Sequence, residues 1–219
     1  MVEIKEIVSI TLQKLIPSYK RNLGKAVALH GIVIEQRFAW LLKNSRKNTI
    51  AIDIGAYIGD TAIYFASFDN VKKVYAYEPY PSLYETALKN VGISKLSNKI
   101  RLFNAGVGES DRIYNLKNNG DIGSEFKDSN SGAAIRSISL NTVLKGKKNV
   151  IIKSNSEGSE YKIFTHASNL KNVYRIHIAY HYGVQKLPEI LRSKGFKIRI
   201  WKEGTDVSKG EVGTIYAWR

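Results

Sequence analysis

Two acidic side chains at the ends of successive strand-like segments are the first candidates for chemistry in this 219-residue sequence. Asp53 ends the run "TIAID", and Glu78 follows "VYAY" 25 residues further along the chain. An acid at the tip of a second strand can accept hydrogen bonds from both hydroxyls of a ribose, and dinucleotide-binding folds use a similar spacing of roughly 20 residues. The pair therefore points to a ligand that contains adenosine, although exposed strand-end carboxylates are also common.

The segment "GAYIGD" between these acids has the composition of a ligand-binding turn. Gly55 and Gly59 let the backbone turn sharply and approach a ligand with no Cβ atom in the way, and Pro79 ends the second strand directly after its acid. The segment lacks the G-x-G-x-x-G of nicotinamide-binding folds and the G-K-[ST] of phosphate-binding loops. We therefore favour a cationic methyl donor, whose carboxylate and ammonium groups can be met by loop N–H groups and by acids such as Asp53.

Alternating strands and helices must position these residues. Buried strand-like runs are predicted at 49–54, 72–78, 100–105, 149–153 and 173–180, with helices at 59–68, 81–91, 159–168 and 184–194, and two final strands near 196–202 and 213–218. Repeated strand-helix units predict an α/β sandwich with a mostly parallel sheet and a terminal hairpin. Ligands of such sheets bind beyond the carboxyl ends of the strands, where the glycine turn is expected.

The remaining segments are less regular. Residues 2–16 have the apolar spacing of an amphipathic helix, 26–38 are strand-like, and the polar stretch 111–136 predicts a hairpin or an excursion over one edge of the sheet. No repeat or linker divides the chain. We expect one domain over 1–219, in which 1–48 form a helix and strand extension and 49–219 form the ligand-binding core.

Composition excludes several classes of protein. The chain has no cysteine, which excludes disulfides, thiolate metal sites and a cysteine nucleophile. Charged residues interrupt the first apolar stretch, so we expect neither a signal peptide nor a membrane span, and a cytoplasmic location. The net charge of +15 is compatible with nucleic acid, an anionic membrane or an acidic substrate. We favour a solvated lysine-rich surface instead, because no compact run of Lys and Arg with interleaved aromatics stands out.

Several motifs together resemble those of one enzyme family. They are "IDIGAYIGDTAIYFA", "VYAYEPYPSLYETALKN", "IRLFNAGVGE", "IRSISLNTVL" and "VIIKSNSEGSEYKIF". In this order, over roughly residues 49–168, they resemble the motifs of FkbM-type S-adenosylmethionine-dependent methyltransferases. The resemblance implies a Rossmann-like class I methyltransferase sandwich with a mostly parallel seven-stranded sheet and a terminal antiparallel hairpin, and S-adenosylmethionine as the cofactor.

The resemblance also assigns roles to individual residues. In the family, the first motif surrounds the methionine part of the cofactor, the acid after the second strand holds the ribose, and the loop after the third strand lies along the adenine. These roles are carried over to Asp53, Gly55, Ala56, Tyr57 and Gly59, to Glu78 and Pro79, and to Asn104 and Ala105.

Two positions depart from the family pattern. Tyr57 stands where Asn is usual, and the fourth strand, which usually continues as K-x-D-x-E-G, here continues from Lys153 to Gly158 with Asn155 in place of the aspartate. The second departure removes a carboxylate from the place where the methyl group is delivered. It also leaves this strand without the acid that would help to hold Mg²⁺, and no local spacing of acids and histidines predicts a metal site.

Methyl transfer from a sulfonium mainly requires alignment of donor and acceptor and exclusion of water, and a hydroxyl acceptor also benefits from a base. The candidate bases near the fourth strand are Glu157, then His181, and also Glu160 and His177. Each has an equally plausible structural role, such as complementing a helix dipole or lying in the core. Asn155 itself can orient a hydroxyl but cannot take its proton.

Three functions remain open at this point. The first is O-methylation of a small molecule, a glycan or a lipid head group. The second is methylation or binding of RNA, which the net charge of +15 suggests, although the N-P-P-Y type motif is absent. The third is a non-catalytic domain that binds the cofactor, which Asn155 suggests. The sequence does not identify the acceptor.

Overall fold

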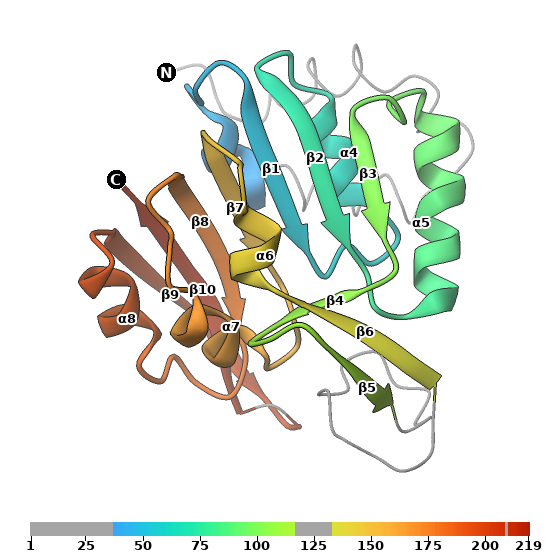
Figure 1. Ribbon diagram of the computed structural model, residues 1–219. Helices are drawn as coiled ribbons and strands as arrows, with labels where there is room; N and C mark the ends of the chain where they lie inside the picture. The colour runs from blue at the N-terminus through green and yellow to red at the C-terminus, as the bar shows by residue number, and fades with distance from the viewer. Residues whose placement is uncertain (1–36, 117–132, 209) are drawn as a thin grey trace.

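The computed structural model describes residues 37–116, 133–208 and 210–219, and its centre is a seven-stranded sheet with the order β3-β2-β1-β7-β8-β10-β9 (Figure 1). Its five parallel strands are β1 (Thr49–Ile54), β2 (Val71–Tyr77), β3 (Ile100–Phe103), β7 (Val150–Ser154) and β8 (Val173–Tyr180). The antiparallel hairpin of β9 (Lys197–Asp206) and β10 (Gly210–Trp218) completes the sheet. The prediction of a mostly parallel sheet with a terminal antiparallel hairpin is confirmed.

Helices cover both faces of the sheet, as the predicted sandwich requires. On one face lie α4 (Asp60–Ala66) and the helical residues 37–42, whose apolar side chains form one core with the side chains of β1 and β2. On the other face, α6 (Leu140–Leu144), α7 (Glu160–His166) and α8 (Leu187–Ser193) form a second core with β7 and β8. The helix α5 (Pro81–Ser94) contacts α4 and β3 at the edge of the sheet (Figure 1).

The strands are parallel and central because their sequences suit burial on both sides. Every residue of β7, "VIIKS", is buried, and β1 is buried at all but one position. Strands covered on both faces contain continuous runs of Val and Ile rather than alternating polar residues. Consequently Asp53 and Lys153, the charged members of β1 and β7, lie inside the sheet layer and must find partners there.

A second, three-stranded sheet has the order β4-β6-β5. It consists of β4 (Gly106–Gly108), β5 (Arg112–Leu116) and β6 (Ala133–Ser139), of which β5 and β6 pair antiparallel. In Figure 1 this sheet extends from the end of β3 at which the first sheet places its carboxyl ends. It agrees with the predicted hairpin or excursion for the described parts of 111–136, while 117–132 lie outside the described residues.

The predictions for the N-terminal region are mostly untested, and one of them is wrong. The amphipathic helix at 2–16 and most of the strand-like segment 26–38 lie outside the described residues. The strand prediction is wrong for residues 37 and 38, because 37–42 are helical. Phe38, Leu41 and Leu42 have helical spacing and are all buried, so packing against the sheet favours a helix here.

Candidate active site

The turn after β1 is held against the neighbouring strand tips. The N–H groups of Gly55 and Ala56 both donate to the carbonyl of Tyr77 at 3.0 Å, and Gly55 has a φ of 72°. A Cβ atom on Gly55 would lie 1.9 Å from the carbonyl oxygen of Asn155, in the loop after β7. Glycine is therefore required at position 55 first by the approach of this chain's own backbone, whereas the sequence suggested the approach of a ligand.

The second glycine of the turn also packs against protein. Gly59, with a φ of 84°, precedes the first residue of α4, and a Cβ there would lie 3.2 Å from the Cβ of Ala87 on α5. Ala56 is buried in the core beneath α4. The side of the turn that faces open space is formed by Gly55 and Tyr57, and the side chain of Tyr57 is 37% exposed.

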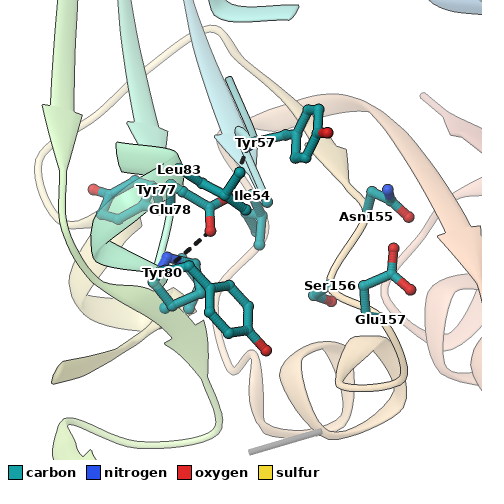
Figure 2. Close-up of a pocket in the computed structure, with 13 residues that line it drawn as sticks. Ile54, Tyr57, Tyr77, Glu78, Tyr80, Leu83, Asn155, Ser156 and Glu157 are labelled. Atoms are coloured by element: carbon teal, nitrogen blue, oxygen red, sulfur yellow. Dashed lines mark hydrogen bonds between the residues drawn. The ribbon is translucent and has the colours of Figure 1, made fainter. Parts of the chain in front are cut away.

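Glu78, at the tip of β2, is held by two backbone donors. Its Oε2 accepts a 2.7 Å hydrogen bond from the N–H of Tyr57, and its Oε1 accepts one of 3.0 Å from Tyr80 (Figure 2). Only 3% of the residue is exposed. Burial raises the pKa of Glu78 to about 7, against the opposing effect of the two N–H donors. The carboxylate still has acceptor capacity, because each oxygen carries two lone pairs.

Residues after the third strand support this strand tip in different ways. The side-chain amide of Asn104 donates to the carbonyls of Glu78 and Pro79, at 3.0 Å each. Ala105 is 1% exposed and belongs to the core, so it does not reach the open site. Sequence reasoning missed the two residues that follow it, Gly106 and Val107, which do line the site. Their position next to "NA" in the third motif is the signal that points to them.

These strand tips enclose a cavity of about 260 Å³ (Figure 2). Its lining consists of Ile54, Gly55, Tyr57, Tyr77, Glu78, Pro79, Tyr80, Leu83, Gly106, Val107, Asn155, Ser156 and Glu157. Glu78 lies on one side of the cavity and Glu157 on the other (Figure 2). A mostly apolar cavity with a few convergent polar groups is the usual form of a small-molecule site.

A smaller cavity of about 140 Å³ adjoins the first one. Three residues, Gly55, Tyr57 and Asn155, line both cavities. The remaining lining residues of the smaller cavity are Arg37, Phe38, Asp60, Thr61, Lys153, His177 and Ala179. The glycine turn and Asn155 thus form the boundary between an apolar space beside Glu78 and a more polar space beside Lys153.

Asp53 lines neither cavity. It is fully buried, and its Oδ1 lies 2.9 Å from the Nζ of Lys153 on the adjacent strand β7. Burial raises the pKa of Asp53, while the charge of Lys153 and its hydrogen bond oppose that shift. The same ammonium donates a 2.6 Å hydrogen bond to the carbonyl of Gly55. Asp53 therefore acts on the turn through Lys153, a link that the sequence did not reveal because it depends on the register of two strands.

His177 lies in the core and faces the smaller cavity. Its ring packs edge-to-face against Phe38 and Tyr216, with centroid distances of 4.7 and 5.4 Å. Within the described parts of the chain, neither ring nitrogen has a hydrogen-bond partner. Burial, together with the charges of Arg37 and Lys153, holds the pKa of His177 well below its usual value, so the ring is neutral at neutral pH. His177 lines the smaller cavity and not the larger one, so it does not share a cavity with Glu157.

The other three candidate bases form one cluster. Glu160 is buried and accepts hydrogen bonds from the N–H groups of Ser156 and Gly158, at 2.8 and 2.9 Å. The Nδ1 of His181 lies 3.2 Å from Glu160, and its Nε2 lies 3.5 Å from Glu157. Glu160 therefore holds the loop after β7 and orients His181, while Glu157 is the member of the cluster that lines the larger cavity.

In residues 37–116, 133–208 and 210–219, no group of three or more His, Cys, Asp or Glu side chains is placed to hold a metal ion. Among the same residues, no helix has the length and apolar character needed to span a membrane.

The chain was compared with known proteins at the level of sequence. The family model described as the methyltransferase FkbM domain matches residues 53–198, a span that includes both cavities' strand tips. A comparison with curated proteins gives no match.

Solved structures were compared at the level of the fold. TrmK of M. capricolum, solved with S-adenosyl-homocysteine, is 18% identical with a TM-score of 0.51, over 83% of this chain and 67% of TrmK. Sp1610 of Streptococcus pneumoniae, a proposed tRNA (m1A22) methyltransferase solved with S-adenosyl-L-methionine, is 17% identical with a TM-score of 0.51, over 84% of this chain and 73% of Sp1610. Precorrin-6y C5,15-methyltransferase of Geobacter metallireducens is 15% identical with a TM-score of 0.50, over 84% of this chain and 89% of the precorrin enzyme. At these identities the likeness concerns the fold.

Proposed function

Because the chain belongs to the FkbM methyltransferase family, we propose that it transfers a methyl group to a hydroxyl of a small molecule, a glycan or a lipid head group. It is an S-adenosylmethionine-dependent methyltransferase with a Rossmann-like class I fold. The observation that carries the choice of a hydroxyl acceptor is the Glu157 carboxylate, which lines the larger cavity and is backed by His181. A hydroxyl needs a base of this kind for efficient methylation.

The side chains around the larger cavity suit the adenosine part of the cofactor. Glu78 is a buried carboxylate with acceptor capacity left over for two ribose hydroxyls. Tyr77, Leu83 and Val107 supply apolar walls for a flat base. We assign the cavity to adenosine for these reasons, with Pro79 in its lining and Asn104 bracing the strand tip.

The smaller cavity suits the methionine end of the cofactor. It offers Asp60 for an ammonium group, next to Thr61 at the start of α4, and the backbone N–H groups of that helix start for a carboxylate, while Arg37 in the same lining is paired with Glu203. Asp53 was expected to meet these groups directly. Since Asp53 lines neither cavity, its proposed role is to hold Lys153, which fixes the carbonyl of Gly55 between the two spaces.

Asn155 and Tyr57, at the boundary of the cavities, and Glu157, in the lining of the larger cavity, have the proposed catalytic roles. When bound, the cofactor supplies an electrophilic methyl group on a sulfonium. Asn155 orients the acceptor hydroxyl by hydrogen bonding, and Glu157 accepts its proton. Glu160 positions the ring of His181 through Nδ1, and the Nε2 of the same ring lies 3.5 Å from the carboxylate of Glu157. Tyr57, which is partly exposed over both cavities, excludes water.

Asn155 also supports a second candidate, a cofactor-binding domain without catalysis, because an amide there removes the carboxylate that the family usually has. The test is to incubate the protein with radiolabelled S-adenosylmethionine and fractions of a cell extract that hold small molecules, glycans, lipids or RNA. Transfer to one of the first three fractions, and its loss in Glu157→Gln, supports the proposed function. Cofactor binding by calorimetry without transfer to any fraction favours the second candidate, and transfer to RNA alone contradicts the proposed acceptor.

We extend the proposal to the organisation of the chain. Residues 1–219 are proposed to act as one methyltransferase domain, with 49–219 as its cofactor-binding core. The two hydrophobic cores on opposite faces of a single sheet support this organisation.

A further inference from the structure

A third cavity lies away from the strand tips, on the α4 face of the sheet where β8, β10 and β9 adjoin. Its volume is about 590 Å³. Pairing across these strands places Arg175 opposite Trp218, and Tyr216 opposite both His177 and Arg199, so that these side chains share one face. We call this cavity the tryptophan groove. It touches the smaller cavity of the active site through Arg37, which lines both.

Aromatic side chains form much of its wall. The chain has three tryptophans, and all of them, Trp40, Trp201 and Trp218, line the groove together with Tyr216. Trp201 is 57% exposed and Trp218 is 38% exposed, whereas exposed tryptophan is costly unless a partner covers it. Trp40 packs edge-to-face on Tyr216 at 5.2 Å between ring centroids, which holds these two rings in place.

Positive charge surrounds these rings. Four of the lining residues, Arg37, Lys43, Arg175 and Arg199, are cationic, and none of the described lining residues is acidic. Glu203 neutralises Arg37 through a 2.5 Å ion pair. The charge of Arg175 is met by backbone carbonyls, since its Nη1 donates to Trp40, Leu41 and Lys43, and no ion pair to a carboxylate is present for it among the described residues. The groove therefore keeps a net positive charge.

The described wall of the groove contains one buried donor without an acceptor. The indole Nε1 of Trp40 is buried, and within the described parts of the chain it has no hydrogen-bond partner. Anionic oxygens are the acceptors that suit the guanidinium groups of Arg175 and Arg199 in the same wall.

We propose that the tryptophan groove binds a short stretch of single-stranded nucleic acid. Sites for unpaired strands combine a positive channel that follows the phosphates with aromatic rings on which bases stack, and this groove has both. A neutral glycan carries no negative charge to complement the net positive charge of the described lining residues. An anionic membrane surface would not enter a hollow in which Tyr216 and Trp40 form part of the wall. The net charge of +15 favours the approach of the same ligand.

The proposal is independent of the methyl acceptor, because of the groove's residues only Arg37 also lines an active-site cavity. It also explains why the sequence showed no compact basic and aromatic run. The members come from residues 37–44, from β8 and from the β9–β10 hairpin, and the fold brings these separate segments together.

The chain carries its own reporter for this test, because its tryptophans all lie in the groove. A twelve-nucleotide oligo(U) is titrated into the full-length protein, and tryptophan fluorescence is expected to be quenched as bases stack. Polarisation of a labelled oligo(U) then gives the affinity of three variants. Trp201→Ala removes a stacking ring and should weaken binding roughly 5- to 150-fold. Arg199→Glu should weaken binding and make the salt dependence shallower, by about 0.7 in the log–log slope for one lost phosphate contact.

Lys89→Glu is the matched charge control. It changes the net charge by the same amount as Arg199→Glu, on an exposed position of α5, which packs at the β3 edge of the sheet. Binding should be nearly unchanged in this variant. Equal weakening in Lys89→Glu and Arg199→Glu, or unchanged affinity in Trp201→Ala, would overturn the proposal in favour of diffuse charge. Quenching by anionic phosphatidylglycerol vesicles or by polygalacturonate, with none by oligo(U), would also overturn it.

Discussion

The carboxylate of Glu78 and the backbone N–H of Tyr57 form a 2.7 Å hydrogen bond that joins the tip of β2 to the turn after β1. The two residues follow the ends of the neighbouring strands β1 and β2, and both line the larger cavity (Figure 2). Through this bond, a ligand that contacts Glu78 is also held next to Tyr57, which faces the smaller cavity as well. The relationship couples the proposed ribose site to the proposed place of methyl transfer.

Glu78→Ala should weaken binding of S-adenosylhomocysteine by roughly one to two decades. Hydrogen bonds to a charged group contribute about 1.5–3 kcal/mol, and this variant removes the acceptor for the ribose hydroxyls. Calorimetry on the parent and the variant measures the change. Equal affinities, or no binding by the parent protein, would show that Glu78 does not hold the ribose.

The stability of the cofactor-free protein should depend on pH through Glu78. Its pKa in the folded protein is about 7, above the ordinary 4.5, so the folded state binds more protons than the unfolded chain between these values. The free energy of unfolding should therefore fall as pH rises from 4.5 to just above 7, by about 3 kcal/mol at most. Urea titrations of the parent and of Glu78→Gln at several pH values test this. The free energy of unfolding of the parent minus that of Glu78→Gln should fall steadily as pH rises across that range, and a constant difference would contradict the shifted pKa.

Gly55→Ala should destabilise the fold itself. The added Cβ would meet the carbonyl oxygen of Asn155 at 1.9 Å, and alanine also disfavours the φ of 72°. Crowding of this kind costs about 1–3 kcal/mol beyond the backbone penalty. Gly146→Ala is the matched control, since Gly146 has a φ of 73° but no atoms within 4 Å of a Cβ. Thermal or urea unfolding should show a larger loss for Gly55→Ala, and equal losses would mean that the loop after β7 moves aside freely.

The sequence predicted the sheet well because its strands follow from local composition. Segments such as "VIIKS" and "VYRIHIAY" are buried on both sides of a parallel sheet, and apolar runs of this length reveal such strands without knowledge of their neighbours. The helix was missed because its described part, residues 37–42, has little intrinsic helicity. Its stability comes from burying Phe38 and Leu41 against other elements, which the sequence does not display.

The sequence predicted those site residues whose role follows from their position at the end of one strand. Glu78 was recognised because it follows a strand and precedes proline. Lys153 was not recognised as a partner of Asp53, because their contact depends on the pairing of β1 with β7. Gly59 and Ala105 have the motif positions expected of ligand contacts, yet they pack against α5 and the core, because a motif also encodes the packing that supports a site.

Lys153→Met should be strongly destabilising. The methionine leaves the fully buried Asp53 without its cation, and breaking a buried ion pair in this way costs about 3–5 kcal/mol. The double variant Asp53→Asn with Lys153→Met should recover much of the loss, because no buried charge is left unpaired. Urea unfolding of the four proteins in this cycle gives the coupling energy. Strict additivity of the two single changes would show that the 2.9 Å contact contributes nothing to stability.

The last prediction concerns the end of the site at which Asn155 replaces the usual aspartate. If Glu157 is the base, Glu157→Gln should lower the rate of methyl transfer by about 10²- to 10⁴-fold without changing cofactor affinity. Asn155→Asp restores a carboxylate with almost no change in volume, so it separates charge from packing. In an enzyme that relies on Glu157, the added charge should raise the pH at which the rate reaches half its maximum, since a neighbouring negative charge raises the pKa of a carboxyl group.

In a protein whose catalysis was lost with the aspartate, the Asn155→Asp variant should raise turnover instead. Methyl transfer measured against pH for the parent and both variants distinguishes these cases, and identical profiles for all three proteins would place the chemistry elsewhere.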